Sequence, residues 1–209
     1  NSSTPVDVSD LPSGVTTLAA GSNHTCALNT RGGAQCWGNN GFGQLGDGTS
    51  RNSDAPVGVS GLGSGVIALT AGGSHTCALT IGGGAKCWGY NWYGQLGDGT
   101  ITILQRTPVD VSGLSRGATA LAAGAWHTCA LTVGGGVKCW GGNFFGELGD
   151  GTTNISRTPV DVIGLTTGVI AVTVGSSHSC ALTTSGGVKC WGANWNGQLG
   201  DGTTSNRST

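Results

Sequence analysis

Short apolar runs bounded by glycine recur along the whole chain and alternate with turn-like segments. One copy of the pattern holds a Pro-Val run, a β-branched run such as GVIALTAG, and two further runs of the types HTCAL and VKCWG. A glycine-rich turn such as TVGGG separates the last two runs. No stretch shows helical periodicity of useful length, and the glycine density disfavours helix. The pattern predicts four short β-strands per copy.

Three phrases mark four copies of this pattern. The HTCAL phrase, with one HSCAL variant, begins at His24, His75, His127 and His178. The CWG phrase begins at Cys36, Cys87, Cys139 and Cys190, and LGDGT begins at Leu45, Leu96, Leu148 and Leu199. Equivalent cysteines are 51, 52 and 51 residues apart, and the extra residue falls in the loop DGTITILQRT. Four strands in about 50 residues are typical of a propeller blade, which must stack on neighbours to bury its faces.

The combined pattern resembles a known repeat. G-x-x-H-T-C-A-L, then G-x-x-x-C-W-G-x-N-x-x-G-Q-L-G-D-G-T, then R-T-P-V-x-V is similar to the repeat of the regulator of chromosome condensation (RCC1-like) family, in its bacterial extracellular, disulfide-containing version. The resemblance implies a β-propeller, usually seven-bladed, whose blades are four-stranded antiparallel sheets. This chain has four copies instead of seven. We therefore expect an all-β propeller domain over 1–209, built from four blades of about 51 residues.

The first and last residues of the chain occupy equivalent places in the repeat. NSST precedes the first Pro-Val run, and NRST ends the chain where the next such run is expected. This register predicts repeats at approximately 5–55, 56–107, 108–158 and 159–209, the last completed by a PVDV strand in cis or in trans. Such a chain can close as a small ring, join other chains in a larger ring, or propagate head to tail. The same register also fits a chain cut from a longer repeat array.

Eight cysteines form four pairs with ten-residue spacing: Cys26/Cys36, Cys77/Cys87, Cys129/Cys139 and Cys180/Cys190. If CALNTRGGAQC is a hairpin, Ala27 faces Gln35 and Leu28 faces Ala34. Both cysteines then lie opposite each other, with Cα atoms about 4.5 Å apart at a non-hydrogen-bonded pair. The alternative is zinc, held by two cysteines and a nearby histidine, but the tight C-x₂₋₄-C spacing is missing. The spacing favours one disulfide per blade.

A disulfide in every blade indicates an oxidising compartment, so we expect an extracellular or cell-surface protein. Low lysine content and the absence of methionine agree with this location. Four N-x-S/T sequons are possible glycosylation sites. They begin at Asn1, Asn23, Asn154 and Asn206.

The repeated histidines and aspartates are the obvious candidates for chemistry. An active site breaks repeat symmetry, whereas every copy carries the same histidine with no carboxylate nearby in sequence. We expect each histidine to hydrogen-bond backbone of its own or the adjacent blade. The LGDGT aspartates fit an Asp-Gly turn, while calcium would need more oxygen ligands than this loop offers. We expect no catalytic residue, no metal and no cofactor, and thus a protein that is not an enzyme.

The tryptophans fall into two groups. Trp37, Trp88, Trp140 and Trp191 follow the second cysteine, where packing between blades is expected. Other aromatic residues vary between copies in the aligned loops Asn40-Gly41-Phe42, Asn91-Trp92-Tyr93, Asn143-Phe144-Phe145 and Asn194-Trp195-Asn196. Possible partner contacts are therefore Phe42, Trp92, Tyr93, Phe144, Phe145 and Trp195. Both a binding surface and ordinary loop packing would explain these aromatics.

Composition and motifs narrow the function. Net charge is −1 with three lysines, so no basic surface for nucleic acid is expected, and no apolar run approaches the roughly 18 residues of a membrane span. The resemblance also names two functions that the residues disfavour. The ultraviolet-receptor branch repeats GWRHT, which only Trp126 matches here, and the nuclear exchange-factor branch relies on features outside the repeat that this chain lacks.

Two functions remain. The first is a non-enzymatic extracellular structural protein that self-assembles with other copies of itself, as a subunit of a head-to-tail ring or filament. The second is a secreted module, inhibitor-like or adhesin-like, that binds another protein through the loop aromatics on one propeller face.

Overall fold

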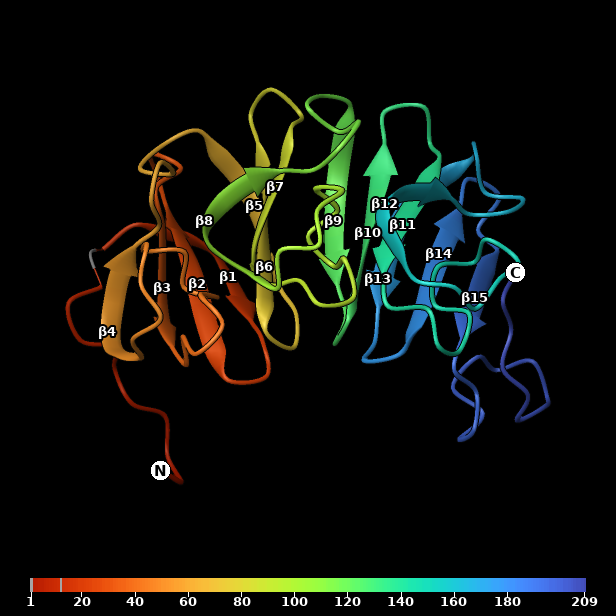
Figure 1. The fold of residues 1–209 in the computed structure, drawn as a ribbon, viewed down its shortest axis with the longest axis horizontal. Helices are drawn as coiled ribbons and strands as arrows, with labels where there is room; N and C mark the ends of the chain where they lie inside the picture. Colours follow the sequence, from red (N-terminus) through yellow and green to blue (C-terminus); the bar gives the residue numbers. More distant parts are fainter. Residues whose placement is uncertain (1, 12) are drawn as a thin grey trace.

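The structure is a computed structural model that describes residues 2–11 and 13–209. Within these residues the chain forms four antiparallel sheets and no helix (Figure 1). The first sheet contains β1 (Val15–Ala20), β2 (His24–Asn29), β3 (Ala34–Gly38) and β4 (Ser53–Gly58). The second contains β5 (Val66–Ala71), β6 (His75–Thr80), β7 (Ala85–Tyr90) and β8 (Leu104–Asp110). The third contains β9 (Ala118–Ala123), β10 (His127–Thr132), β11 (Val137–Gly141) and β12 (Ser156–Asp161).

The fourth sheet contains β13 (Val169–Val174), β14 (His178–Thr183) and β15 (Val188–Gly192). Beyond β15, one bridge joins Gly192 to Arg207, and the described residues hold no further strand there. In each of the other sheets, the outermost strand carries the Pro-Val run that opens the next copy. An edge strand suits proline, which has no N–H for a second ladder.

The first Pro-Val run differs from the sequence prediction. Pro5–Val8 was expected to be a short strand, but the structure has no strand at these residues. Val6 and Val8 are exposed. The physical reason is that no sheet edge lies beside this segment to supply the ladder hydrogen bonds of a strand.

The predicted hairpin register is confirmed. Cys26 lies opposite Cys36, Ala27 opposite Gln35 and Leu28 opposite Ala34. A disulfide joins the two cysteines of each blade, with Cα–Cα distances of 4.0 Å in the first blade and 4.1 Å in the others. No cysteine among the described residues is left as a zinc ligand. Four intra-blade disulfides indicate an oxidising environment.

Neighbouring blades are joined through one backbone carbonyl. Gln44 O of the first blade accepts hydrogen bonds from Trp88 Nε1 at 2.9 Å and from Thr76 Oγ1 at 2.8 Å, both in the second blade. Because the threonine proton is used on this carbonyl, His24 Nε2–H donates to Thr76 Oγ1, at 2.8 Å. The equivalent joints use Gln95 with Trp140, Thr128 and His75, and Glu147 with Trp191, Ser179 and His127.

These joints confirm the packing of three tryptophans between blades and correct the prediction for the histidines. Trp88, Trp140 and Trp191 are fully buried, whereas Trp37 of the first blade is only half-buried. The histidines were expected to bond to backbone, but His24, His75 and His127 instead bond a hydroxyl of the next blade. The hydroxyl relays the bond to the backbone carbonyl, so the two blades are held by a histidine, a hydroxyl and a tryptophan together.

Burial keeps the joint histidines neutral. It lowers the pKa of His24 to about 4, and those of His75 and His127 to about 3. Nδ1 of His24 and of His75 has no hydrogen-bond partner among the described residues, so a proton added there would be buried and unpaired. The neutral ring with its proton on Nε2 is the form that fits the joint.

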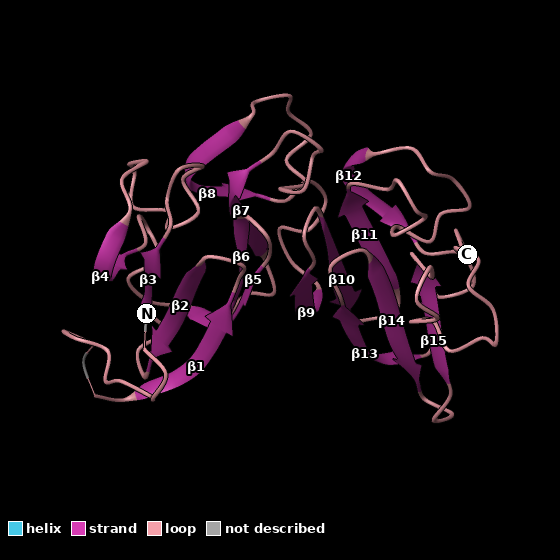
Figure 2. Cartoon of the chain, turned by 90° about the horizontal axis from the view of Figure 1, so that it is seen from below, coloured by secondary structure: helices cyan, strands magenta, loops and turns pink. Residues whose placement is uncertain are grey.

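The four sheets stand side by side in an arc (Figures 1 and 2). The first strands of the sheets, β1, β5, β9 and β13, contact one another in succession along the inner side. The two chain termini lie at opposite ends of the arc in both views. In this structure the four blades form an open arc in which the fourth does not close on the first.

The joint between the second and third blades can be tested with Thr128→Val. The substitution keeps the side-chain shape but removes the hydroxyl that links His75 Nε2 to Gln95 O. His75 Nε2 and Gln95 O then each lose a hydrogen bond while they stay buried. We therefore expect the free energy of unfolding to fall by about 2 kcal/mol. Chemical denaturation measures this change.

Thr25→Val is the matched control. Thr25 occupies the same place in the first blade, is half-buried, and makes no side-chain hydrogen bond among the described residues. It should change stability little. Equal losses in the two variants would contradict the role of the joint.

The lowered histidine pKa values predict acid sensitivity. Unfolded histidine titrates near pH 6.5, so between pH 6.5 and 4 the unfolded chain binds more protons than the folded chain. The stability from the neutral histidines is complete above pH 6.5 and decreases as the pH falls toward 4. Glu147 acts in the opposite direction, because burial raises its pKa, but it is one group against three. Unfolding free energies measured at pH 7, 6, 5 and 4 should decrease steadily; a flat profile would refute this account.

Candidate functional site

The aromatic loops that follow the third strand of each blade are built on a buried asparagine. In the second blade Asn91 Oδ1 accepts from Leu96 N at 3.0 Å, and Asn91 Nδ2 donates to Asp98 Oδ1 at 3.2 Å. Asp98 also accepts from Thr100 N at 3.0 Å and from Thr100 Oγ1 at 2.8 Å. The Asp-Gly turn expected from LGDGT is thus confirmed, and its carboxylate caps the turn. In the other blades the side chains of Asn40, Asn143 and Asn194 make the equivalent hydrogen bonds.

In the first three blades a second contact ties the loop to the joint with the next blade. Tyr93 N donates to Gln95 Oε1 at 3.0 Å, and the backbone carbonyl of Gln95 accepts from Trp140 of the next blade. In the third blade a glutamate replaces this glutamine, and Phe145 N donates to Glu147 Oε2 at 2.7 Å. Burial raises the pKa of Glu147. The loops are therefore held at both ends, which fixes the aromatic side chains that they carry.

Five aromatic rings from three blades form one connected group, which we name the aromatic cluster. Its members are Phe42, Tyr90, Tyr93, Trp126 and Phe144. Ring centroids are 4.7 Å apart for Phe42–Tyr90, 5.8 Å for Tyr90–Trp126, 5.7 Å for Tyr93–Trp126 and 5.0 Å for Tyr93–Phe144. Phe42, Trp126 and Phe144 are exposed, so the cluster is a surface feature and not a core.

The remaining loop aromatics continue this face. Phe145 and Trp195 pack edge to face, with centroids 4.7 Å apart, across the third and fourth blades. Trp92 is 55% exposed and joins no ring pair among the described residues. Of the six residues named from sequence, the structure thus places three in the cluster and two in the Phe145–Trp195 pair.

Sequence reasoning missed Tyr90 and Trp126 as members of this surface. Tyr90 lies at the centre of the cluster, in contact with three other rings. The available signal was asymmetry, because the residue after CWG is Asn39, Tyr90, Gly142 or Ala193 in the four copies. Trp126 precedes its histidine, where the other copies carry asparagine or serine.

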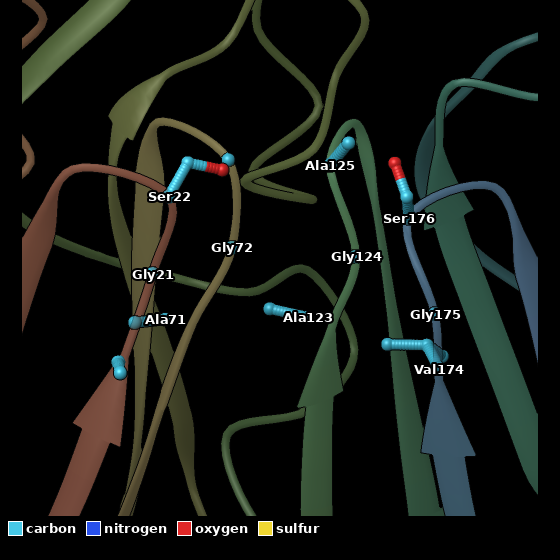
Figure 3. A pocket seen from close by; sticks show the side chains of 12 residues that line it. Gly21, Ser22, Ala71, Gly72, Ala123, Gly124, Ala125, Val174, Gly175 and Ser176 are labelled. Carbon is cyan, nitrogen blue, oxygen red and sulfur yellow. The ribbon is translucent and has the colours of Figure 1, made fainter.

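A hollow lies where the first strands of the four blades, β1, β5, β9 and β13, end, and Figure 3 shows it from close by. Its volume is about 310 Å³, and glycine, alanine, serine and one valine line it. Ser22 and Ser176 lie on opposite sides of it (Figure 3). Gly21 is required there, because a Cβ atom would strike the His24 ring and the carbonyl of Gly72. None of the described residues that line this hollow has an ionisable side chain.

The predicted glycosylation sites remain predictions. Asn23, Asn154 and Asn206 are exposed, and Asn1 lies outside the described residues. Asn206 also has a structural role, since its Oδ1 accepts from Asn194 N at 2.8 Å. Nothing in the part of the chain that the structure describes groups three histidine, cysteine, aspartate or glutamate side chains as a metal site. That part also has no helix long and apolar enough to cross a membrane.

Relatives identified by sequence are much longer proteins. The chain is 33% identical over 194 residues to the ultraviolet-B receptor UVR8 of Arabidopsis thaliana, covering 91% of this chain and 44% of that protein. It is 34% identical over 196 residues to the probable E3 ubiquitin-protein ligase HERC4 of Homo sapiens, covering 92% of this chain and 18% of that one. The chain thus spans less than half the length of these relatives.

Solved structures agree on the fold. Human WBSCR16 superposes with a TM-score of 0.83 and 28% identity, over 94% of this chain and 52% of that one. Yeast RCC1 (Prp20), solved with Kap60, gives a TM-score of 0.87 at 22% identity, over 99% of this chain and 50% of that one. The second likeness shows the fold alone.

Family models locate the repeats directly. One model of the regulator of chromosome condensation (RCC1) repeat matches residues 15–44, 66–95, 118–147 and 169–198, and a second matches 32–79, 87–131 and 135–182. The matched segments contain the disulfide hairpins, the joint tryptophans and the first residues of the aromatic loops. On this evidence, the chain belongs to the regulator of chromosome condensation (RCC1) repeat family.

Proposed function

We propose that this chain is a non-enzymatic, extracellular protein-binding module whose binding face comprises the aromatic cluster together with Trp92, Phe145 and Trp195. One observation carries the proposal: large aromatic side chains from all four blades lie exposed on loops that buried hydrogen bonds hold in place. Rigid aromatic side chains are favoured anchors at protein interfaces, because they bury much area and lose little conformational entropy.

The fold supports a binding role. RCC1-repeat propellers commonly mediate protein binding, and the structure report on Prp20p of Saccharomyces cerevisiae describes binding to Gsp1p and histones. Those partners are stated for that protein. Here the aromatic face supplies a different chemistry, in which apolar and edge-to-face contacts would dominate, since the chain has only nine lysine and arginine residues.

The repeated polar residues support binding rather than catalysis. Three of the four histidines are buried in blade joints and kept neutral, and the LGDGT aspartates cap their own turns. The extracellular part of the proposal rests on the four disulfides and on the sequons, of which three are exposed.

The binding face can be tested with Trp126→Ala and Trp195→Ala. Each removes one exposed ring, so we expect at least a tenfold loss of affinity for a purified 1:1 partner, measured by calorimetry. The partner would come from affinity capture with the intact chain, in non-reducing conditions. Val133→Ala is the control, because Val133 is 80% exposed but lies in the hairpin turn at the other end of β10 from Trp126. Equal binding by all three variants would refute this face.

Self-association is a second candidate function, and the outer faces of the arc favour it. Leu18 of the first blade is 64% exposed, while its counterpart Leu69 in the second blade is 9% exposed. At the other end, His178 is only part-buried and makes no side-chain hydrogen bond among the described residues. These two faces carry the complementary halves of the blade joint, so a face of one copy fits a face of another. Head-to-tail association would give a ring or a filament.

Light scattering of the 209-residue, non-reduced chain tests this second candidate. We expect a mass of two or more chains that grows with concentration, and a return to one chain in Leu18→Glu, which places a charge in the joint. Val133→Glu adds the same charge away from both faces and should leave the mass unchanged. A single-chain mass at every concentration would exclude self-association without affecting the binding proposal.

A further inference from the structure

One loop breaks the repeat of the molecule. The segment between Thr100 and Arg106 holds the extra residue of the second copy, and β8 starts at Leu104 as a seven-residue strand. In the first and fourth blades an asparagine side chain closes this loop, as in the bond from Asn40 N to Asn52 Oδ1 at 2.8 Å. In the second blade Asn91 N donates instead to the backbone carbonyl of Ile103, at 2.7 Å. Backbone has replaced a polar side chain, and isoleucines occupy the loop surface.

These isoleucines form one wall of a groove between the second and third blades. Its volume is about 490 Å³. The side chains that matter here are Trp92, Ile101, Ile103, Phe144, Ile155 and Arg157. Ile101 is 81% exposed, and Ile103, Trp92 and Phe144 are exposed as well. Tyr93 also lines the groove and belongs to the aromatic cluster, so the two surfaces are continuous.

Arg157 is the one charged residue lining this groove within the described chain. Its counterpart one blade earlier, Arg106, is held by a neighbour, because Arg106 Nε donates to Ser50 Oγ at 2.7 Å. The position of Ser50 is taken by Ile101 in the second copy, which offers no acceptor. Consequently the guanidinium of Arg157 makes no hydrogen bond or ion pair among the described residues.

We propose that this groove is a specificity pocket for a protein segment in which one carboxylate side chain is flanked by aliphatic residues. The inference deepens the proposed binding function and rests on it. The carboxylate pairs with the Arg157 guanidinium, whose planar fork suits a bidentate contact. The aliphatic neighbours lie against Ile101, Ile103 and Phe144. Where the first copy has Ser50, the second copy has Ile101. This one difference leaves the Arg157 guanidinium without the hydroxyl partner that Arg106 has, and it also supplies the apolar wall of the groove.

Defined peptides provide the probe. The reference is acetyl-Leu-Leu-Glu-Leu-Leu-amide, compared with analogues that carry glutamine or lysine at the centre, and with one that carries serine in place of every leucine. Titration followed by NMR, using the indole N–H of Trp92 and the amide of Arg157, reports contact at the groove itself. Since a charge-assisted hydrogen bond is worth a tenfold factor or more, the glutamate peptide should bind about tenfold more tightly than the glutamine analogue.

Three variants decide the outcome. Arg157→Gln removes the charge and should abolish the preference for glutamate over glutamine. Ile101→Ser restores the polar residue of the first copy and should weaken the reference peptide about tenfold. Arg106→Gln is the matched control, because Arg106 occupies the same place one blade earlier and lies outside the groove; it should bind as the unchanged chain does.

Equal affinity for the glutamate and glutamine peptides, or no shift of the Trp92 and Arg157 signals at millimolar peptide, would overturn the pocket. So would an equal loss of binding in Arg106→Gln. The wider binding function fails separately, if Trp126→Ala and Trp195→Ala leave partner capture unchanged. If the peptide experiments fail but Trp126→Ala and Trp195→Ala still lose partner capture, the groove is not a specificity pocket and the wider binding function stands.

Discussion

The backbone carbonyl of Gln44 accepts two hydrogen bonds from the next blade, and the rest of the architecture depends on this contact and its repeats at Gln95 and Glu147. One blade has two flat faces and too little core of its own, so it must stack. The joint fixes how it stacks, because an indole and a hydroxyl must both reach one oxygen. A neutral histidine completes the joint from the other side. The direction and spacing of neighbouring blades follow from that geometry.

The residue that supplies the carbonyl at each joint also connects the stability of the fold to the binding face. Gln95 reaches the next blade through its backbone and holds Tyr93 N through its side chain. The loop is thereby anchored to the joint, and its aromatic residue is presented at a fixed place. Because each blade presents this loop at the same place, aromatic side chains on successive blades come close enough for ring centroids to lie 4.7–5.8 Å apart. A surface assembled this way is rigid without being part of a core, which suits recognition by preformed side chains.

The repeat is most informative where it is broken. Identical positions serve the joint, the disulfide hairpin and the Asp-Gly turn, all of which every blade needs. Ile101, Trp92 and Trp126 lie at positions where the copies differ, and all three are on one face or in the groove beside it. Since blade architecture does not require those residues, their chemistry is free to serve a partner.

Sequence by itself determined the features that depend on neighbours within one hairpin. The ten-residue cysteine spacing gave the register, because pairing in a short hairpin allows few alternatives, and that register was enough to predict the disulfides. The all-β fold and the four strands of the first three blades followed from periodicity and from the glycines that bound each run, whereas the fourth sheet has three strands. Even so, the pattern over-predicted a strand at Pro5–Val8, since strand formation needs an edge that sequence does not show.

Tertiary structure decided whatever joins residues from different blades. The hydroxyl partner of His24 is 52 residues away and the carbonyl partner of Trp88 is 44 residues away, so neither could be read from local spacing. The central place of Tyr90 in the cluster, the open arc and the unpaired guanidinium of Arg157 have the same origin. Local hydrogen bonds determine the structure of each blade, whereas contacts between residues more than thirty positions apart determine how blades meet. The candidate site is built from contacts of the second kind.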